Sequence, residues 1–182
     1  MTHRLPRTLR LDPSDTVIFA RAAEPGEWAV PGGFAFWDED PAALTGQRRQ
    51  EFRAGFLGLG SFGFSTLVEV AEASPAERAV AVAALAAHIR ACYGAPDEAA
   101  AQAAAEEEIG FAESLCDHPP GTVLALSRSV EAGAVRERFR TLHRRETPRG
   151  DFAGLPVFNI VTVEGEDDES PERPDLTRVG KE

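Results

Sequence analysis

The tetrapeptide Ser74-Pro75-Ala76-Glu77 is the feature that most restricts the fold of this chain. It places a serine at the N-cap, a proline at the first helical position and a glutamate three residues after the serine, which is the pattern of a capping box. A helix is therefore predicted to begin at residue 75. Its apolar face is formed by Val82, Leu85, Ala86, Ile89 and Tyr93.

A second helix is predicted after a short connector. Gly94-Ala95-Pro96 ends the first helix, and Asp97 can cap a helix that runs to about residues 115–117. The apolar side of this helix contains Ala101, Ala105, Ile109, Ala112, Leu115 and Cys116. So short a connector predicts an antiparallel helical hairpin, whose many alanines allow the two helices to approach closely.

Segments with strand character flank the hairpin. They are residues 9–11, 16–19, 28–36 and 65–72 before it, and residues 122–126 and 158–163 after it. The glycine-rich segment 46–64 is predicted to be irregular and partly buried, and residues 132–145 to form a short helix.

These elements predict an α+β fold, in which a mixed or antiparallel sheet packs against the central helical hairpin. Their order from residue 65 onward also matches a split β-α-β arrangement, ferredoxin-like in part. Residues 1–163 are expected to form a single domain. Residues 164–182 are acidic and lack aromatic side chains, which predicts a disordered tail.

Charge and hydropathy exclude two classes of partner. The formal net charge is −11, whereas a nucleic-acid-binding protein needs clustered cations, so no nucleic-acid partner is expected. The sequence contains no run of about 20 apolar residues that could span a membrane, and no signal-peptide core. A cytoplasmic protein is therefore predicted. Cys92 and Cys116 fall at opposite ends of the predicted hairpin, too far apart to form a disulfide or share a metal.

Residues 28–33, Trp-Ala-Val-Pro-Gly-Gly, match the entry to a Nudix hydrolase box. Glu39 also lies at the spacing that this box requires after its second glycine. However, the stretch that should supply paired metal-binding carboxylates reads Gln47-Arg-Arg-Gln-Glu-Phe52 and lacks the pair. A simple hairpin turn is therefore the favoured interpretation of the glycines.

The glycine-rich segment 46–64 is a second candidate ligand site. Backbone amides of such a segment could hold a phosphate, with further contacts from Arg48, Arg49, Arg53 and Ser65. The glycine spacing fits neither a P-loop nor a dinucleotide-binding fingerprint, and no P-loop lysine is present. A structural role for these glycines is therefore favoured over a binding role.

Glu108 lies within the apolar face of the second predicted helix. A carboxylate in such a place must be paired, protonated or bound to a metal. Folding the hairpin about residue 95 brings Arg78 within reach, so a structural Arg78–Glu108 ion pair is favoured over a metal site at Glu108.

Cys116, Asp117 and His118 supply three types of metal ligand in succession. Neighbouring residues on a helix point in different directions, so these three could chelate a metal only if the helix unwinds there. Alternatively, Asp117 favours a turn and His118 interacts with the C-terminal end of the helix dipole.

An arginine stripe, Arg136, Arg140 and Arg144, is expected on one face of the helix predicted at 132–145. It is either a solvated basic face or a surface that docks an acidic protein partner. No Ser-His-Asp or Cys-His arrangement can be assigned from the sequence, and no cofactor is expected.

The sequence resembles an uncharacterised bacterial protein family of unknown function. The resemblance rests on Glu24-Pro-Gly-Glu-Trp-Ala-Val-Pro-Gly-Gly-Phe-Ala-Phe36, on the 52–66 glycine segment, and on Glu106-Glu-Glu108 leading to Cys116. It implies an association with accessory genes of molybdenum-dependent formate dehydrogenases, but no functional residues.

Two classes of function stay open at this point. One is a non-catalytic binding or accessory protein, for example in metalloenzyme maturation. The other is a small-molecule or metal-binding enzyme whose pocket lies between segment 46–64 and the helical hairpin.

Overall fold

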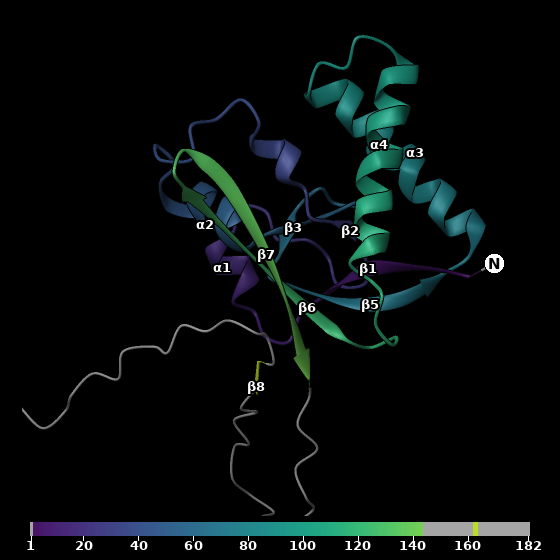
Figure 1. Cartoon of the computed structure of the whole chain (residues 1–182), viewed down its shortest axis with the longest axis horizontal. Helices are drawn as coiled ribbons and strands as arrows, with labels where there is room; N and C mark the ends of the chain where they lie inside the picture. Colours follow the sequence, from purple (N-terminus) through teal and green to yellow (C-terminus); the bar gives the residue numbers. More distant parts are fainter. Residues whose placement is uncertain (1, 144–161, 164–182) are drawn as a thin grey trace, which may run out of the picture.

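The computed structural model describes residues 2–143 and 162–163. In chain order the elements are β1 (His3–Leu9), α1 (Asp15–Ile18), β2 (Ala29–Val30), the 3-10 helix η1 (Gly33–Phe36), α2 (Gly46–Ala54), β3 (Phe56–Gly58), β4 (Phe64–Ser65), β5 (Leu67–Ala73), α3 (Pro75–Cys92), α4 (Glu98–Ser114), β6 (Val123–Glu131), β7 (Ala134–His143) and β8 (Thr162–Val163). Helices and antiparallel sheets occur together (Figure 1), which confirms the α+β prediction.

The strands form two antiparallel sheets. One has the order β1-β5-β6-β7-β8, and the other has the order β2-β3-β4. β5 pairs with β6 only at residues 67–69, whereas β6 and β7 pair from residue 123 to residue 131. The β6–β7 hairpin therefore continues past the rest of its sheet as a two-stranded ribbon, which runs toward α2 (Figure 1).

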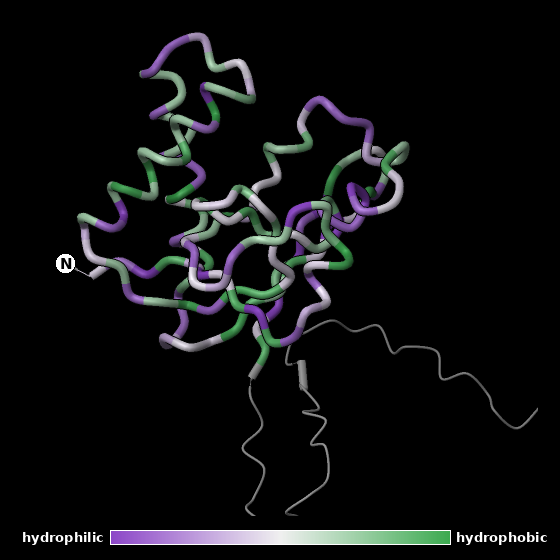
Figure 2. Tube along the Cα trace, turned by 180° about the vertical axis from the view of Figure 1, so that it is seen from behind, coloured by the Kyte–Doolittle hydropathy of each residue, from purple (hydrophilic) through white to green (hydrophobic). Residues whose placement is uncertain are grey.

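The helical hairpin forms as predicted from α3 and α4, which project together from the body (Figure 1). The capping box at α3 is complete, because Ser74 Oγ accepts from Glu77 N–H (3.2 Å) and Ser74 N–H donates to the Glu77 carboxylate (2.8 Å). Asp97 caps α4 by accepting from Ala100 N–H at 2.7 Å. In Figure 2 the colour along the two helices changes repeatedly between hydrophobic and hydrophilic, as expected where each helix buries one side.

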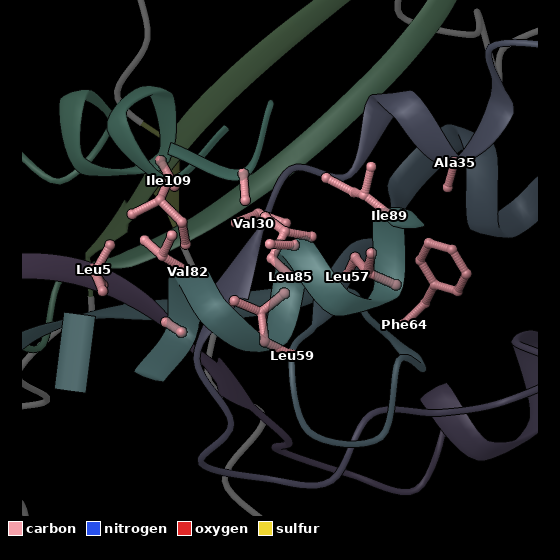
Figure 3. Close-up of a cluster of buried hydrophobic side chains, with 14 of the residues drawn as sticks. Leu5, Val30, Ala35, Leu57, Leu59, Phe64, Val82, Leu85, Ile89 and Ile109 are labelled. Carbon is pink, nitrogen blue, oxygen red and sulfur yellow. The ribbon is translucent and has the colours of Figure 1, made fainter. Parts of the chain in front are cut away.

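The main core lies between the hairpin and the two sheets. Val82, Leu85 and Ile89 of α3 pack toward Val30 and Leu57 of the smaller sheet (Figure 3). A second cluster forms around the larger sheet and consists of Ala29, Phe56, Val68, Val70, Cys116, Leu124 and Leu126. None of the helices in the described part combines the length and the apolar character needed to cross a bilayer.

The prediction of a helix at 132–145 is wrong, because residues 134–143 form β7. Ala132 and Gly133 both have positive φ, 50° and 80°, and make the two-residue turn of a β-hairpin with β6. Arginines spaced four residues apart share one side of a strand as well as one face of a helix, so their spacing could not distinguish the two.

The strand predicted at 16–19 is also wrong, and of the strand segment predicted at 28–36 only β2 is formed. Residues 16–19 lie largely in α1, which begins where Asp12 Oδ1 accepts from Ser14 N–H and Ser14 O accepts from Ile18 N–H. Residues 33–36 form η1, because the chain turns at Gly32 (φ 72°), whose carbonyl accepts from Ala35 N–H.

The split β-α-β order is not formed. A hairpin of two helices returns the chain to the end of the sheet that it left, so β6 runs antiparallel beside β5. Segment 46–64 is more regular than predicted and contains α2, β3 and the first residue of β4. The strand predicted at 158–163 is described only at Thr162–Val163, which form β8, and the predicted tail 164–182 lies outside the described residues.

Candidate functional site

The turn Pro31-Gly32-Gly33 connects β2 to η1 and sets the position of the candidate site. A Cβ atom at Gly32 would lie 2.7 Å from the Leu57 Cβ, and its φ of 72° is left-handed, so both space and conformation require glycine here. A Cβ atom at Gly33 would lie 3.0 Å from the Glu137 carboxylate. This close-fitting turn places Phe34 beside the helical hairpin, where its ring meets Tyr93 edge to face with centroids 5.2 Å apart.

Arg128, on β6, holds the Pro31-Gly32-Gly33 turn in place. Its guanidinium is fully buried and donates to the backbone oxygens of Phe52 (3.1 Å), Gly55 (3.2 Å) and Pro31. Its Nε also donates to Glu137 Oε1 at 2.6 Å. One side chain of β6 thus ties together β7, the end of α2 and the turn that borders the site.

Glu108 contacts the same turn from the side of the hairpin. Gly32 N–H donates to Glu108 Oε1 at 3.0 Å, which is the hydrogen bond that the described residues provide for this carboxyl group. The predicted Arg78–Glu108 pair is wrong, because Arg78 instead binds Glu106 (2.9 Å) and Glu113 (3.0 Å). Residues 106 and 113 are two turns apart and share one face of α4, whereas residue 108 is rotated by about 140° from residue 113.

Burial raises the pKa of Glu108 above its ordinary value of 4.5. The Gly32 hydrogen bond and the charge of Arg128 act in the opposite direction, while Glu137 and Glu107 add to the increase in the pKa. The folded protein therefore disfavours the ionised form of this side chain.

A Glu108→Gln variant is expected to be more stable than the wild type at about pH 7, with the difference disappearing toward about pH 4. With a raised folded-state pKa, the stability that protonated Glu108 contributes is present at low pH and is lost as the pH rises through that pKa. Glutamine keeps an oxygen for Gly32 N–H but does not ionise. Urea unfolding across this pH range measures the effect, with Glu72→Gln on the exposed side of β5 as the control. A variant less stable than the wild type at neutral pH would show that the ionised carboxylate is favoured.

A pocket of about 490 Å³ lies between this turn and the hairpin. Half of its lining residues are aromatic, and two others carry carboxyl groups; the residues are Phe34, Trp37, Ile89, Tyr93, Ala104, Glu107, Glu108 and Phe111. Trp37 is 70% exposed and Phe111 is 40% exposed, so large apolar surfaces stay open to solvent at its rim. Cavities of this size accommodate small molecules.

Comparison with known proteins places the sequence in a family but gives no biochemistry. A family of unknown function (DUF6505) matches residues 1–155. The chain belongs to this family. No curated protein and no solved structure matches the chain. The family match confirms the resemblance to an uncharacterised family that the sequence motifs indicated.

Sequence reasoning missed the aromatic members of the pocket. Phe111 lies outside the alanine-rich apolar side of α4 and is 40% exposed, and its ring meets Phe139 edge to face with centroids 5.8 Å apart. An aromatic residue outside the apolar side of its helix was the feature of the sequence that could have indicated a binding site. Trp37 gave no comparable signal, because its position beside the hairpin depends on the Gly32 turn.

The residues of the predicted phosphate site do not gather around one space. Arg48 binds Glu39 and Glu51, donates to Ala35 O (2.8 Å) and lies 4.1 Å above the Phe36 ring. Arg49 and Arg53 are exposed on α2. Ser65 is buried and donates to Leu67 O at 2.8 Å.

The glycine-rich loop between β3 and β4 does hold an anion, but the anion belongs to the chain itself. The carboxylate of Glu27 accepts from the N–H groups of Gly60 (3.3 Å) and Ser61 (2.9 Å) and from Ser61 Oγ (3.0 Å). A Cβ atom at Gly58 would lie 2.2 Å from the same carboxylate. The glycines therefore accommodate an internal side chain.

The candidate metal ligands are not brought together. Among the described residues, no three His, Cys, Asp or Glu side chains are grouped so that they could hold a metal ion. Cys116 is buried in the second core cluster, and burial raises the pKa of its thiol to about 12. Asp117 is exposed, and the backbone oxygen of His118 accepts from Arg4. Glu108 lies at the pocket instead.

The predicted docking arginines lie on β7 and not on a helix. Arg136 and Arg140 are exposed on one side of that strand, together with Arg138, which pairs with Glu131 at 2.9 Å. Arg144 lies outside the described residues.

Proposed function

We propose that this chain is a non-catalytic binding protein, and that its binding site is the aromatic pocket between the Pro31-Gly32-Gly33 turn and the helical hairpin. The observation that carries the proposal is the exposure of Trp37 and Phe111 at the rim of a pocket of about 490 Å³. Exposed aromatic surfaces around a cavity are expected where a ligand or partner supplies the missing contacts.

The internal bonding of the polar residues favours binding over catalysis. In the described part of the chain, Arg10 Nε is the single buried side-chain nitrogen or oxygen atom without a hydrogen-bond partner. Arg48, Arg128 and Glu27 are each held by several contacts within the protein. The charged groups of these three side chains are therefore used in contacts that hold the fold together.

A cysteine–histidine contact is the strongest feature on the catalytic side. Cys92 Sγ lies 3.8 Å from His88 Nδ1, at the long end of the range for hydrogen bonds that involve sulfur. His88 is stacked on Phe62 with ring centroids 3.7 Å apart, and burial lowers its pKa. This stack also occupies the contact between segment 46–64 and the hairpin, where the alternative enzyme pocket was expected.

A role as an accessory protein agrees with such a pocket. The pocket volume lies in the range of small-molecule sites, and an accessory protein of the kind that the family resemblance implies can act by binding such a molecule. No metal site is part of the proposal.

An Ala104→Trp variant is expected to weaken or block binding, because Ala104 lines the pocket and a tryptophan there places a large ring inside it. The measurement is a fragment screen of the isotope-labelled protein by NMR, monitored at the Trp37 indole N–H. We expect fragments that shift this signal in the wild type, and no such shift in the variant.

The matched control is Ala103→Trp, on the same exposed helix but outside the pocket lining. It should bind the same fragments as the wild type. The proposed site would be contradicted if no fragment shifted the Trp37 signal of the wild type. It would also be contradicted if the Ala104→Trp variant still bound the same fragments.

A further inference from the structure

The aromatic pocket carries more negative charge than its surroundings balance. Glu107 and Glu108 both line it. The nearby cations are already matched, since Arg128 binds Glu137 and Arg48 binds Glu39 and Glu51. Among the described residues neither lining carboxyl group forms an ion pair, although the charge of Arg128 acts on Glu108 from a distance.

The lining also supplies several aromatic faces and edges around one space. Phe34, Trp37, Tyr93 and Phe111 come from three different parts of the chain, namely the turn with η1, the end of α3 and the last turn of α4. Aromatic rings attract cations through the negative potential of their faces, and cages of rings with a carboxylate bind alkylated ammonium groups. A strongly hydrated metal ion gains little from such rings, whereas an organic cation gains contact with both rings and charge.

We propose that the pocket binds a small organic cation, with a substituted ammonium group held by the four aromatic side chains and its charge balanced by Glu108. This inference rests on the proposed function and specifies the ligand class of the same site. Glu108 Oε1 is oriented by Gly32 N–H, which leaves the second carboxyl oxygen of this pocket-lining residue without a hydrogen-bond partner among the described residues.

The charge balance gives the binding a dependence on pH. The groups that face Glu108 are Glu107 on the same helix, Glu137 on β7, Arg128 on β6 and the Gly32 amide. Burial raises the Glu108 pKa, and a bound cation favours the ionised form. Binding of the cation therefore strengthens as the pH rises through the Glu108 pKa and is accompanied by proton release.

The test compares choline with dimethylbutanol, its neutral isostere in which carbon replaces the quaternary nitrogen. Titrations followed by NMR at the Trp37 indole N–H and the Gly32 amide should show choline binding about tenfold more tightly than the isostere, as expected for a partly desolvated cation–aromatic contact. In Glu108→Gln the choline affinity should fall toward that of the isostere, because the carboxylate that balances the charge is lost while the contact with the aromatic rings remains. The affinity for dimethylbutanol should stay unchanged, which shows that the pocket is intact in the variant.

Glu72→Gln removes one negative charge away from the pocket and should change neither affinity. Equal binding of the two probes, or choline binding that Glu108→Gln does not weaken, would overturn the cation site while leaving a neutral binding pocket. The absence of shifts at Trp37 and Gly32 with both probes would also overturn it. If choline still shifted these signals in Ala104→Trp, the binding site would not be this pocket, and the proposed function would be contradicted as well.

Discussion

Substituting Arg128→Met is expected to lower the free energy of unfolding by about 3–5 kcal/mol, the usual cost of breaking a buried ion pair. The guanidinium is fully buried and binds Glu137 together with three backbone oxygens. Methionine fills much of the volume but donates no hydrogen bond. The three oxygens and the carboxylate would then lose their donor inside the protein, where they cannot all be hydrated.

Urea unfolding measures this loss, and Arg138→Met is the matched control. Arg138 lies on the neighbouring strand and is 55% exposed, and its pair with Glu131 is largely hydrated. Such surface pairs contribute less than about 1 kcal/mol. If the two variants lost similar stability, the internal contacts of Arg128 would not hold β6, β7 and the Pro31 turn together.

Gly32→Ala should also be strongly destabilising, by about 2–4 kcal/mol. A left-handed φ of 72° costs a residue with a side chain about 1–2 kcal/mol. The added methyl group would in addition lie 2.7 Å from the Leu57 Cβ in the main core. Because Gly32 N–H orients Glu108, the same substitution should also disturb the pocket.

Gly94→Ala separates the two contributions. Gly94 has a similar φ of 69°, but a Cβ atom there would meet no atom within 4 Å. The control should therefore lose only the conformational part, about 1–2 kcal/mol. Thermal or urea unfolding of both variants gives the comparison. Equal losses would mean that Leu57 moves aside at no cost.

The helical hairpin could be predicted because its determinants are local. The capping box at Ser74 and the N-cap at Asp97 lie within a few residues of the bonds that they make. The apolar faces of α3 and α4 likewise follow from the helical period alone. Local hydrogen bonds and periodicity are what a single sequence displays directly.

The remaining features depend on contacts between distant residues. The identity of β7 is set by its register with β6 and by a turn with two positive φ angles, whereas the four-residue spacing of its arginines fits a helix equally well. To predict that Arg78 pairs with Glu106 and Glu113, one must know which face of α4 is turned toward α3, as well as how far along the helix axis each residue lies. The pocket unites residues from position 34 to position 111, which no local pattern brings together.

The alternation of arginines along β7 affects how the folded chain meets other copies of itself. Within the described residues, the outer side of this strand pairs only at Leu142 and His143, with β8. An open strand edge is a template for intermolecular β-pairing, and charged side chains are a common protection against it. Arg136, Arg138 and Arg140 place one positive charge at every second residue of that edge. An approaching identical strand would bring like charges together, so the ribbon can stay unpaired without nucleating aggregates.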